Sequence, residues 1–101
     1  MGKMIVNAIQ YKLAKGTDEK SFLSASNKLM PKLAKLSGFI KRELLKDESG
    51  IWLDSVYWKS MQQARESEEK ITAISECMKC INMMDSSSMK VMLFEQIQNY
   101  E

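Results

Sequence analysis

The chain has 101 residues, of which 45% are hydrophobic and 28% are charged, so it has a globular composition outside the disordered range. Its 15 basic and 13 acidic residues are spread along the chain and leave a formal charge of +2. This distribution gives no cluster of basic residues of the kind that binds nucleic acid. No segment approaches the roughly 18 consecutive apolar residues of a membrane span, and the start MGKMIVNAIQ lacks a signal-peptide pattern. We therefore expect one cytoplasmic domain over residues 1–101, without a membrane or nucleic-acid partner.

The N-terminal part predicts a strand followed by a helix. Residues 4–13 are rich in strand formers, and Thr17 is a candidate N-cap for the helix. Apolar residues at three- and four-residue steps extend the helix to about Ser37, before Gly38, which suits a left-handed cap. Pro31 lacks a backbone N–H, so a kink or a break into two pieces is expected there.

Two strand-like runs, residues 39–47 and 51–58, flank a short turn that ends in glycine and predict an antiparallel hairpin. The two-residue period of the second strand gives one face Trp52, Asp54, Val56 and Trp58, and the other face Ile51, Leu53, Ser55 and Tyr57. Both faces are substantially apolar. We therefore expect helices to cover one face and a second copy of the chain to cover the other.

The C-terminal part predicts helix and then strand. Ser60 and Gln63 form a capping-box pattern for a helix that runs to about Ala73, and Ser75 is expected to cap a second helical piece. A run of serines then precedes a last strand at residues 89–98. The order β-α-β-β-α-β predicts an α+β, ferredoxin-like fold, with helices on one face of an antiparallel four-stranded sheet.

The hairpin and its exit carry a family pattern, made of Gly38-Phe39, Glu43, Trp52, Tyr57-Trp58-Lys59-Ser60 and Ala64. With it, nearly the whole chain resembles the antibiotic-biosynthesis monooxygenase-like superfamily, and within it a group of small, uncharacterised bacterial proteins. The resemblance implies a dimeric α/β barrel in which two sheets meet face to face and each subunit has a pocket between sheet and helices. Its members include cofactor-free oxygenases of quinol-like aromatics, haem-degrading enzymes and proteins without known activity, and the fold does not decide among them.

Asp54 and Trp58 are the main candidate site residues. In the cofactor-free oxygenases of the superfamily, an asparagine and a tryptophan at similar spacing sit in the substrate pocket, and Asp54 departs from that asparagine. A carboxylate among apolar side chains is a candidate base for an acidic phenol. The alternative is that Asp54 pairs with a neighbouring Lys or Arg at the sheet surface, while Trp58 belongs to the core. Tyr57 and Trp52 complete the predicted substrate pocket.

Asn7 on the first strand is a candidate hydrogen-bonding partner for a ligand, and the haem-degrading relatives have an asparagine near this place. Their haem is held by a histidine, and this chain has none. Cys, Met or Tyr would have to replace that axial ligand. We therefore expect neither a cofactor nor a metal.

Cys77 and Cys80 form a C-x-x-C motif. If Ser75 caps the helix, both thiols lie in its first turns, where the helix dipole lowers the thiol pKa and favours a redox role. A zinc site needs about four ligands, which two cysteines without histidine do not supply within one chain. The favoured interpretation is two small buried side chains on a packed helix.

Three functions follow as hypotheses. The first is a cofactor-independent monooxygenase acting on a small aromatic or quinol-like molecule, with Asp54 as base, Trp58 as pocket wall, and Asn7 or a tyrosine as orienting donor. The second is a non-catalytic homodimeric module that binds or senses a small hydrophobic metabolite. The third is a structural dimer with a filled core. The homodimer is expected to form through the sheet face, with an interface that includes Phe39, Leu45, Val91 and Leu93.

Overall fold

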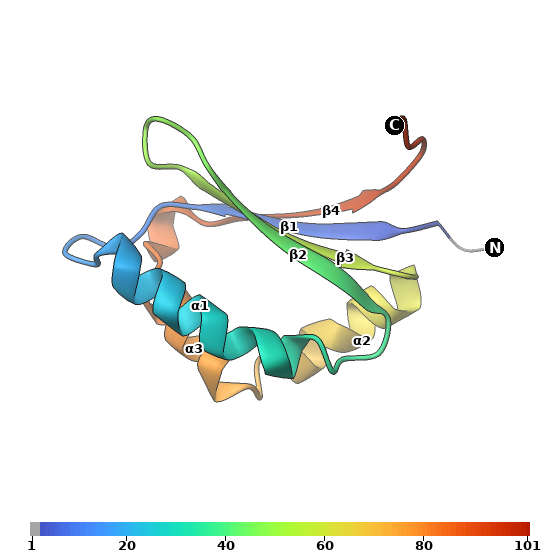
Figure 1. The fold of residues 1–101 in the computed structure, drawn as a ribbon, viewed down its shortest axis with the longest axis horizontal. Helices are drawn as coiled ribbons and strands as arrows, with labels where there is room; N and C mark the ends of the chain where they lie inside the picture. The colour runs from blue at the N-terminus through green and yellow to red at the C-terminus, as the bar shows by residue number, and fades with distance from the viewer. Residues whose placement is uncertain (1–2) are drawn as a thin grey trace.

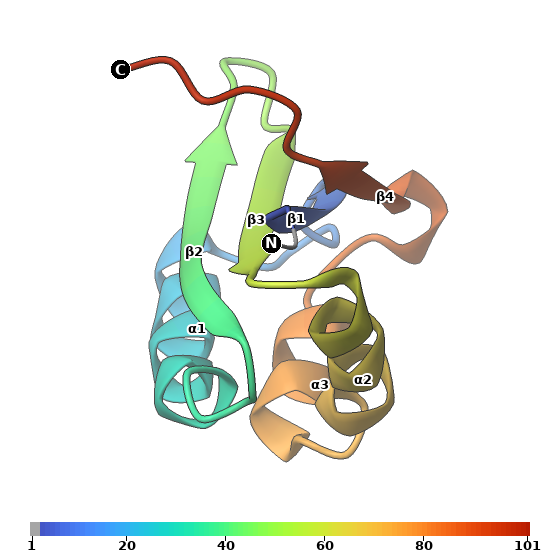
Figure 2. The same ribbon diagram turned by 90° about the vertical axis from the view of Figure 1, so that its right-hand side faces the viewer.

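The computed structural model describes residues 3–101. Its elements are β1 (Ile5–Tyr11), α1 (Glu19–Leu33), β2 (Phe39–Lys46), β3 (Trp52–Trp58), α2 (Met61–Ile71), α3 (Ser75–Asn82), a 3₁₀ turn (Ser86–Ser88) and β4 (Lys90–Glu95). The four strands form one antiparallel sheet in the order β2-β3-β1-β4, and the helices lie on one side of it (Figures 1 and 2). The predicted α+β, ferredoxin-like fold is confirmed, with the second helical region divided into α2 and α3. Within residues 3–101, no helix combines the length and the apolar character needed to cross a membrane.

The N-cap of α1 is Asp18, so the prediction of Thr17 is wrong by one residue. The Asp18 carboxylate accepts hydrogen bonds from the backbone N–H and the hydroxyl of Ser21, each at 2.8 Å. The backbone bond and then the hydroxyl bond hold the pKa of Asp18 below its usual value. A carboxylate therefore serves this helix start, where its negative charge also suits the positive end of the helix dipole.

Helix α1 ends at Leu33, four residues before the predicted end at Ser37, and it is not broken at Pro31. Pro31 lies in the last turn, where its missing N–H removes only the bond to the carbonyl of Asn27. The helix continues for two residues past the proline and then closes through the N–H of Ala34, which donates to the carbonyl of Met30 at 2.9 Å. The proline therefore affects where the helix ends and does not divide it.

The start of α2 was predicted correctly and the start of α3 was not. Ser60 is the N-cap of α2, and its hydroxyl accepts the N–H of Gln63 at 3.2 Å. Gly38 has a φ of +85°, and a Cβ there would lie 2.4 Å from Oε1 of Gln63, so only glycine fits beside this cap. In α3 the N-cap is Ile74, without a side-chain cap bond, and Ser75 is the first helical residue.

The core lies between the sheet and the helices. Its buried hydrophobic residues come from all three helices, from β1 and β3 and from the segment before the 3₁₀ turn: Ile5, Tyr11, Phe22, Leu29, Leu33, Trp52, Trp58, Ala64, Cys77, Cys80 and Met84. Tyr11, Phe22 and Trp52 form an aromatic cluster, in which Phe22 meets Trp52 edge-on with ring centroids 5.2 Å apart. These residues fix the helices against one face of the sheet.

The opposite face of the sheet, here called the open face, carries no helix (Figure 2). Tyr57 pairs with Val6 of β1, and Val6 pairs with Phe94 of β4, so the side chains of these three residues share this face. Leu45 of β2 lies on it as well, opposite Leu53. Leu45 and Phe94 are each 52% exposed, which leaves apolar surface uncovered on this side.

Three of the four residues predicted at the sheet interface lie on the helix side of the sheet. Phe39 packs edge-on against Trp58, with ring centroids 5.9 Å apart. Val91 and Leu93 of β4 pair with Ile9 and Asn7 of β1, which in turn pair with Asp54 and Val56 of β3. Directly paired residues share a face of the sheet, so all of these side chains lie on the helix side. Val91 is nevertheless 65% exposed and Leu93 38% exposed, because β4 is an edge strand that the helices do not cover.

Candidate functional site

A cavity of about 90 Å³ lies between the helix side of the sheet and the helices. One water molecule needs roughly 10–15 Å³ in such a measure, so the space exceeds that of several waters. Strands β1, β2 and β3 and all three helices contribute to its wall, whose apolar part includes Leu29, Leu33, Ile71, Ile81 and Met84. The core is therefore not filled, contrary to the third hypothesis. The cavity lies where the pocket between sheet and helices was expected.

Four polar residues surround Val56 on the sheet side of this cavity. Val56 pairs with Arg42 of β2 and with Asn7 of β1, so these two residues flank it across the strands. Asp54 and Trp58 lie two residues before and after it on β3, on the same face. All five residues line the cavity. The strand register thus gathers a cation, a carboxylate, an amide and an indole around one apolar side chain.

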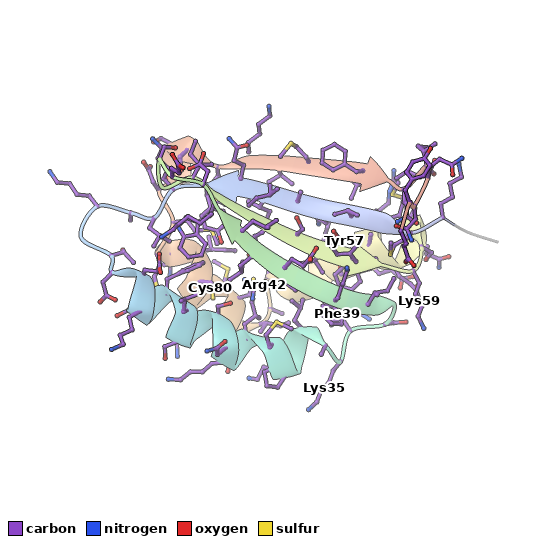
Figure 3. The ribbon with its side chains drawn as sticks, turned by 45° about the horizontal axis from the view of Figure 1, so that its top comes forward. Lys35, Phe39, Arg42, Tyr57, Lys59 and Cys80 are labelled. Atoms are coloured by element: carbon purple, nitrogen blue, oxygen red, sulfur yellow. The ribbon has the colours of Figure 1, made fainter. Side chains whose placement is uncertain are left out.

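Arg42 and Asp54 form a bidentate ion pair in this wall. The Nε of Arg42 donates to Oδ1 of Asp54 at 2.9 Å, and its Nη2 donates to Oδ2 at 2.7 Å. Only 4% of the Arg42 side chain and 9% of the Asp54 side chain are exposed. Figure 3 shows Arg42 on the side of the sheet that faces the helices, in the region of Cys80. Charge-assisted pairs of this geometry are among the strongest hydrogen bonds in proteins.

Neighbouring side chains complete the environment of the ion pair. The Nη1 of Arg42 donates to Oγ of Ser26 at 2.7 Å and lies 3.7 Å from Sδ of Met30. The hydroxyl of Tyr11 donates to Oδ2 of Asp54 over 3.5 Å, a long contact. Burial lowers the pKa of Arg42, but the Asp54 carboxylate outweighs it and the pKa is raised. Burial, and then the Asp54 charge, raise the pKa of Tyr11, which keeps its proton.

Two buried polar atoms in the cavity wall have no hydrogen-bond partner among the described residues. They are Oδ1 of Asn7, an acceptor, and Nε1 of Trp58, a donor. An unpaired buried polar group costs about 1–3 kcal/mol. A ligand hydroxyl can donate to an amide oxygen and accept from an indole N–H. The pair of atoms is therefore suited to a hydroxyl-bearing ligand.

Of the five predicted site residues, Asp54, Trp58 and Asn7 line the cavity, whereas Trp52 and Tyr57 do not. Trp52 stacks on Tyr11 within the aromatic cluster, with ring centroids 6.5 Å apart. Tyr57 lies on the open face, where Nζ of Lys41 is 4.5 Å from the centre of its ring. A hydrogen bond to Glu43 is the main cause that raises the pKa of Tyr57.

The sequence interpretation did not single out Arg42. The alternative for Asp54 foresaw a Lys or Arg partner at the sheet surface, whereas this partner is buried. A usable signal was present in the hairpin. The turn pairs Lys46 with Trp52, and counting back along both strands brings Arg42 opposite Val56, beside Asp54.

Cys77 and Cys80 are free, buried and part of the cavity wall. Burial, and then the neighbouring Cys80, raise the pKa of Cys77 to about 11, and burial raises the pKa of Cys80. Burial thus outweighs the helix dipole, so the predicted lowering of the thiol pKa is wrong. Both residues are neutral thiols at physiological pH. Within residues 3–101, no cluster of three or more His, Cys, Asp or Glu residues is placed to hold a metal.

Comparison with known proteins identifies the fold. No family model matches the chain. No curated protein matches it in sequence either. Among solved structures, SnoaB, a cofactor-independent oxygenase from Streptomyces nogalater, matches with a TM-score of 0.79 at 12% identity, over 97% of this chain and 97% of its own. The chain has the fold of this oxygenase.

Two further structures agree. A candidate antibiotic biosynthesis monooxygenase from Bordetella bronchiseptica matches with a TM-score of 0.77 at 13% identity, over 95% of this chain and 99% of its own. A dimeric ferredoxin-like protein from an uncultured marine organism matches with a TM-score of 0.72 at 12% identity, over 98% of this chain and 92% of its own. The resemblance to antibiotic-biosynthesis monooxygenase-like proteins is thus confirmed in the fold. Function rests on the site.

Proposed function

We propose that this protein is a cofactor-independent monooxygenase that acts on a small aromatic or quinol-like molecule bound above Val56. The observation that carries the proposal is the unpaired acceptor of Asn7 and the unpaired donor of Trp58 in one apolar cavity. A phenolic hydroxyl pairs with both atoms, and its ring is then held by the apolar wall. The oxygenase fold of SnoaB supports the same reaction class.

Asp54 is proposed to take the proton of the bound hydroxyl. A hydroxyl has only one O–H, so this step requires the O–H to turn from the Asn7 amide oxygen toward Asp54. A carboxylate has about four acceptor sites, and Arg42 and Tyr11 use three of those on Asp54. One site remains for the substrate. Loss of the proton places negative charge on the aromatic ring, whose carbon then reacts with molecular oxygen. For a simple phenol the balance is one phenol and one O₂ to one quinone and one water.

The test is oxygen uptake by the protein with a panel of phenols and hydroquinones. We expect the wild type to consume one O₂ for each quinone formed from a phenol. Trp58→Phe, which keeps an aromatic ring but loses the N–H, should reduce the rate, and Asp54→Asn should reduce it further. Tyr57→Phe is the matched control, because Tyr57 lies on the open face. An Asp54→Ala protein with full rate would remove the proposed base, and no uptake with any compound would contradict the oxygenase.

A second candidate is a binding module without turnover, and the ion pair is the observation that favours it. Protonation of Asp54 deprives Arg42 of its partner charge, whereas ligand binding through Asn7 and Trp58 leaves the pair intact. This candidate predicts thermal stabilisation by phenols without oxygen uptake. A ligand at 100 times its Kd adds about 2.7 kcal/mol to the free energy of unfolding.

We also propose that two copies of the chain pair through their open faces. Leu45 and Phe94 expose apolar surface there, and a sheet with one uncovered apolar face favours association. The solved ferredoxin-like relative that is dimeric supports this arrangement. The expected dimer buries the open faces and leaves the cavity on the far side of each sheet.

A further inference from the structure

Arg42 stands at the centre of the polar wall. Its side chain is 4% exposed, it lines the cavity, and it lies opposite Val56, above which the substrate is proposed to bind. A guanidinium has five N–H donors. Four contacts are accounted for, two to Asp54, one to Ser26 and a weak one to Met30. One N–H therefore remains for a further acceptor.

Resting on the proposed function, we propose that Arg42 is a further catalytic residue, the shared counter-ion of Asp54 and of the substrate oxygen that Asp54 deprotonates. In this step the O–H bond of the substrate breaks and an O–H bond forms on Asp54. The electron pair stays on the substrate oxygen, which becomes a phenolate. The negative charge thus moves from Asp54 to the substrate, and the charges of Arg42, Asp54 and substrate sum to zero before and after.

Charge conservation matters because the site is buried. Adding a net charge to an apolar cavity is costly, whereas moving a charge between two positions beside the same cation avoids most of that cost. Among the described residues that line the cavity, only Arg42 and Asp54 are charged. Tyr11, Cys77 and Cys80 are the other titratable groups that face them, and all three stay neutral because burial raises their pKa values. The proton of the substrate hydroxyl can therefore reside on one of two groups, the substrate oxygen or the Asp54 carboxylate.

The assignment explains why an arginine suits this wall better than a lysine. The planar fork of the guanidinium binds both oxygens of Asp54 and keeps a further N–H in the same plane for a second oxygen. A lysine is a single point charge without this geometry. Ser26 of α1 accepts from Nη1 and holds the fork toward Asp54.

The experiment uses 4-nitrophenol, whose phenol and phenolate forms have different absorption spectra. Three proteins are compared at one pH well below the pKa of the free phenol, so that the unbound ligand is protonated. The wild type should bind it partly as phenolate and release no proton to solvent, since Asp54 takes the proton. Asp54→Asn should bind it as phenolate and release one proton, because Arg42 then lacks its carboxylate. In Arg42→Met/Asp54→Asn, which leaves no charge unpaired, the bound form should be the neutral phenol. The phenolate-to-phenol ratio should differ by roughly tenfold or more between the last two proteins.

Proton release is measured by calorimetry in two buffers of different ionisation enthalpy. Asp54→Asn leaves Arg42 without its carboxylate, so if this variant fails to fold, the phenolate-to-phenol ratio of the wild type is compared with that of the double variant. Equal proton release by wild type and Asp54→Asn overturns the proposal. An equal phenolate-to-phenol ratio in the double variant and in either of the other two proteins also overturns it, as does failure of the wild type to bind 4-nitrophenol. If the bound 4-nitrophenol differs among the three proteins as expected, but the protein consumes no oxygen with any substrate, the result would contradict the oxygenase and support the role of Arg42. If the protein consumes oxygen, but the spectrum of bound 4-nitrophenol is the same in all three proteins, the result would contradict the role of Arg42 alone.

Discussion

The two faces of the sheet differ in what surrounds their charged side chains. On the helix side, Arg42 and Asp54 form an ion pair with hardly any exposure, next to a cavity and two unpaired polar atoms. On the open face, Lys41 lies over the ring of Tyr57 beside apolar side chains that have no cover. The proposed chemistry belongs to the first face, which is shielded from water, and the proposed pairing with a second copy belongs to the other.

The difference follows from one residue step along the strands. Arg42 and Lys41 are neighbours in β2, yet the two-residue period puts the first under the helices and the second on the open face. The same electric charge therefore has a strong effect at one position and a weak effect at the other, because water screens only the second. Substitutions at matched positions on the two faces test this contrast.

The largest expected effect is that of breaking the buried ion pair. Arg42→Met leaves the Asp54 carboxylate buried without a partner, which should lower the free energy of unfolding by about 3–5 kcal/mol. Arg42→Met/Asp54→Leu leaves no unpaired charge and should recover most of that loss. Urea denaturation of the three proteins provides the measurement. Equal stability of wild type and Arg42→Met would show that water reaches the pair.

The next effect concerns the open face. Phe94→Glu should weaken the proposed homodimer by at least about 2 kcal/mol, roughly a thirtyfold increase in Kd, because it buries a carboxylate in an apolar interface. The stability of the monomer should change little, since Phe94 is 52% exposed. Sedimentation equilibrium measures the association. Exposed Leu23 of α1 offers a matched control in Leu23→Glu, and a Phe94→Glu protein that remains fully dimeric would place the interface elsewhere.

A smaller effect is expected from the cavity thiols. The pKa of Cys77 is about 11 in the folded protein, against an ordinary value of 9.0. The folded chain therefore keeps a proton that the unfolded chain loses, so this contribution to stability is complete below about pH 9 and is lost as the pH rises toward 11. Urea denaturation from pH 8 to 11 should show a steeper decline for wild type than for Cys77→Ala. Identical slopes would mean that Cys77 is not desolvated.

Most of the fold could be predicted from the sequence, because local signals and long-range packing agree. The Ser60 cap and the hairpin turn each act within a few residues, and their positions were predicted correctly. Gly38 has the expected left-handed φ, but it does not cap α1, which ends at Leu33 with Ala34 as its C-cap. The errors lie where two local candidates compete. Thr17 and Asp18 both suit an N-cap, and the carboxylate is used. Ser75 resembles a cap, but Ile74 holds that position.

The candidate site was less predictable. The resemblance placed Asp54, Trp58 and Asn7 in a pocket, and the cavity contains all three. Strand alternation alone puts Tyr57 on the face opposite Trp58, so its distance from the cavity follows from geometry. The buried position of Arg42 beside Asp54 depends on hairpin register combined with the packing of α1 above it. Neither the unpaired atoms nor the buried state of the ion pair can be read from residue types alone.

The smallest effect sharpens the comparison within one strand. Lys46 lies four residues after Arg42 in β2, on the same face, and also pairs with a carboxylate, that of Glu19 in α1. Its side chain, however, is 44% exposed and that of Glu19 is 48% exposed. Lys46→Met should therefore cost less than about 1 kcal/mol in urea denaturation, and the cost should shrink further in about 1 M salt, which screens exposed charges. The loss in Arg42→Met should persist in salt, because the partner charge is buried. Equal salt sensitivity in the two variants would mean that burial does not cause the difference in stability between the Arg42–Asp54 and Lys46–Glu19 pairs. That difference would then have to come from the bidentate geometry of arginine alone.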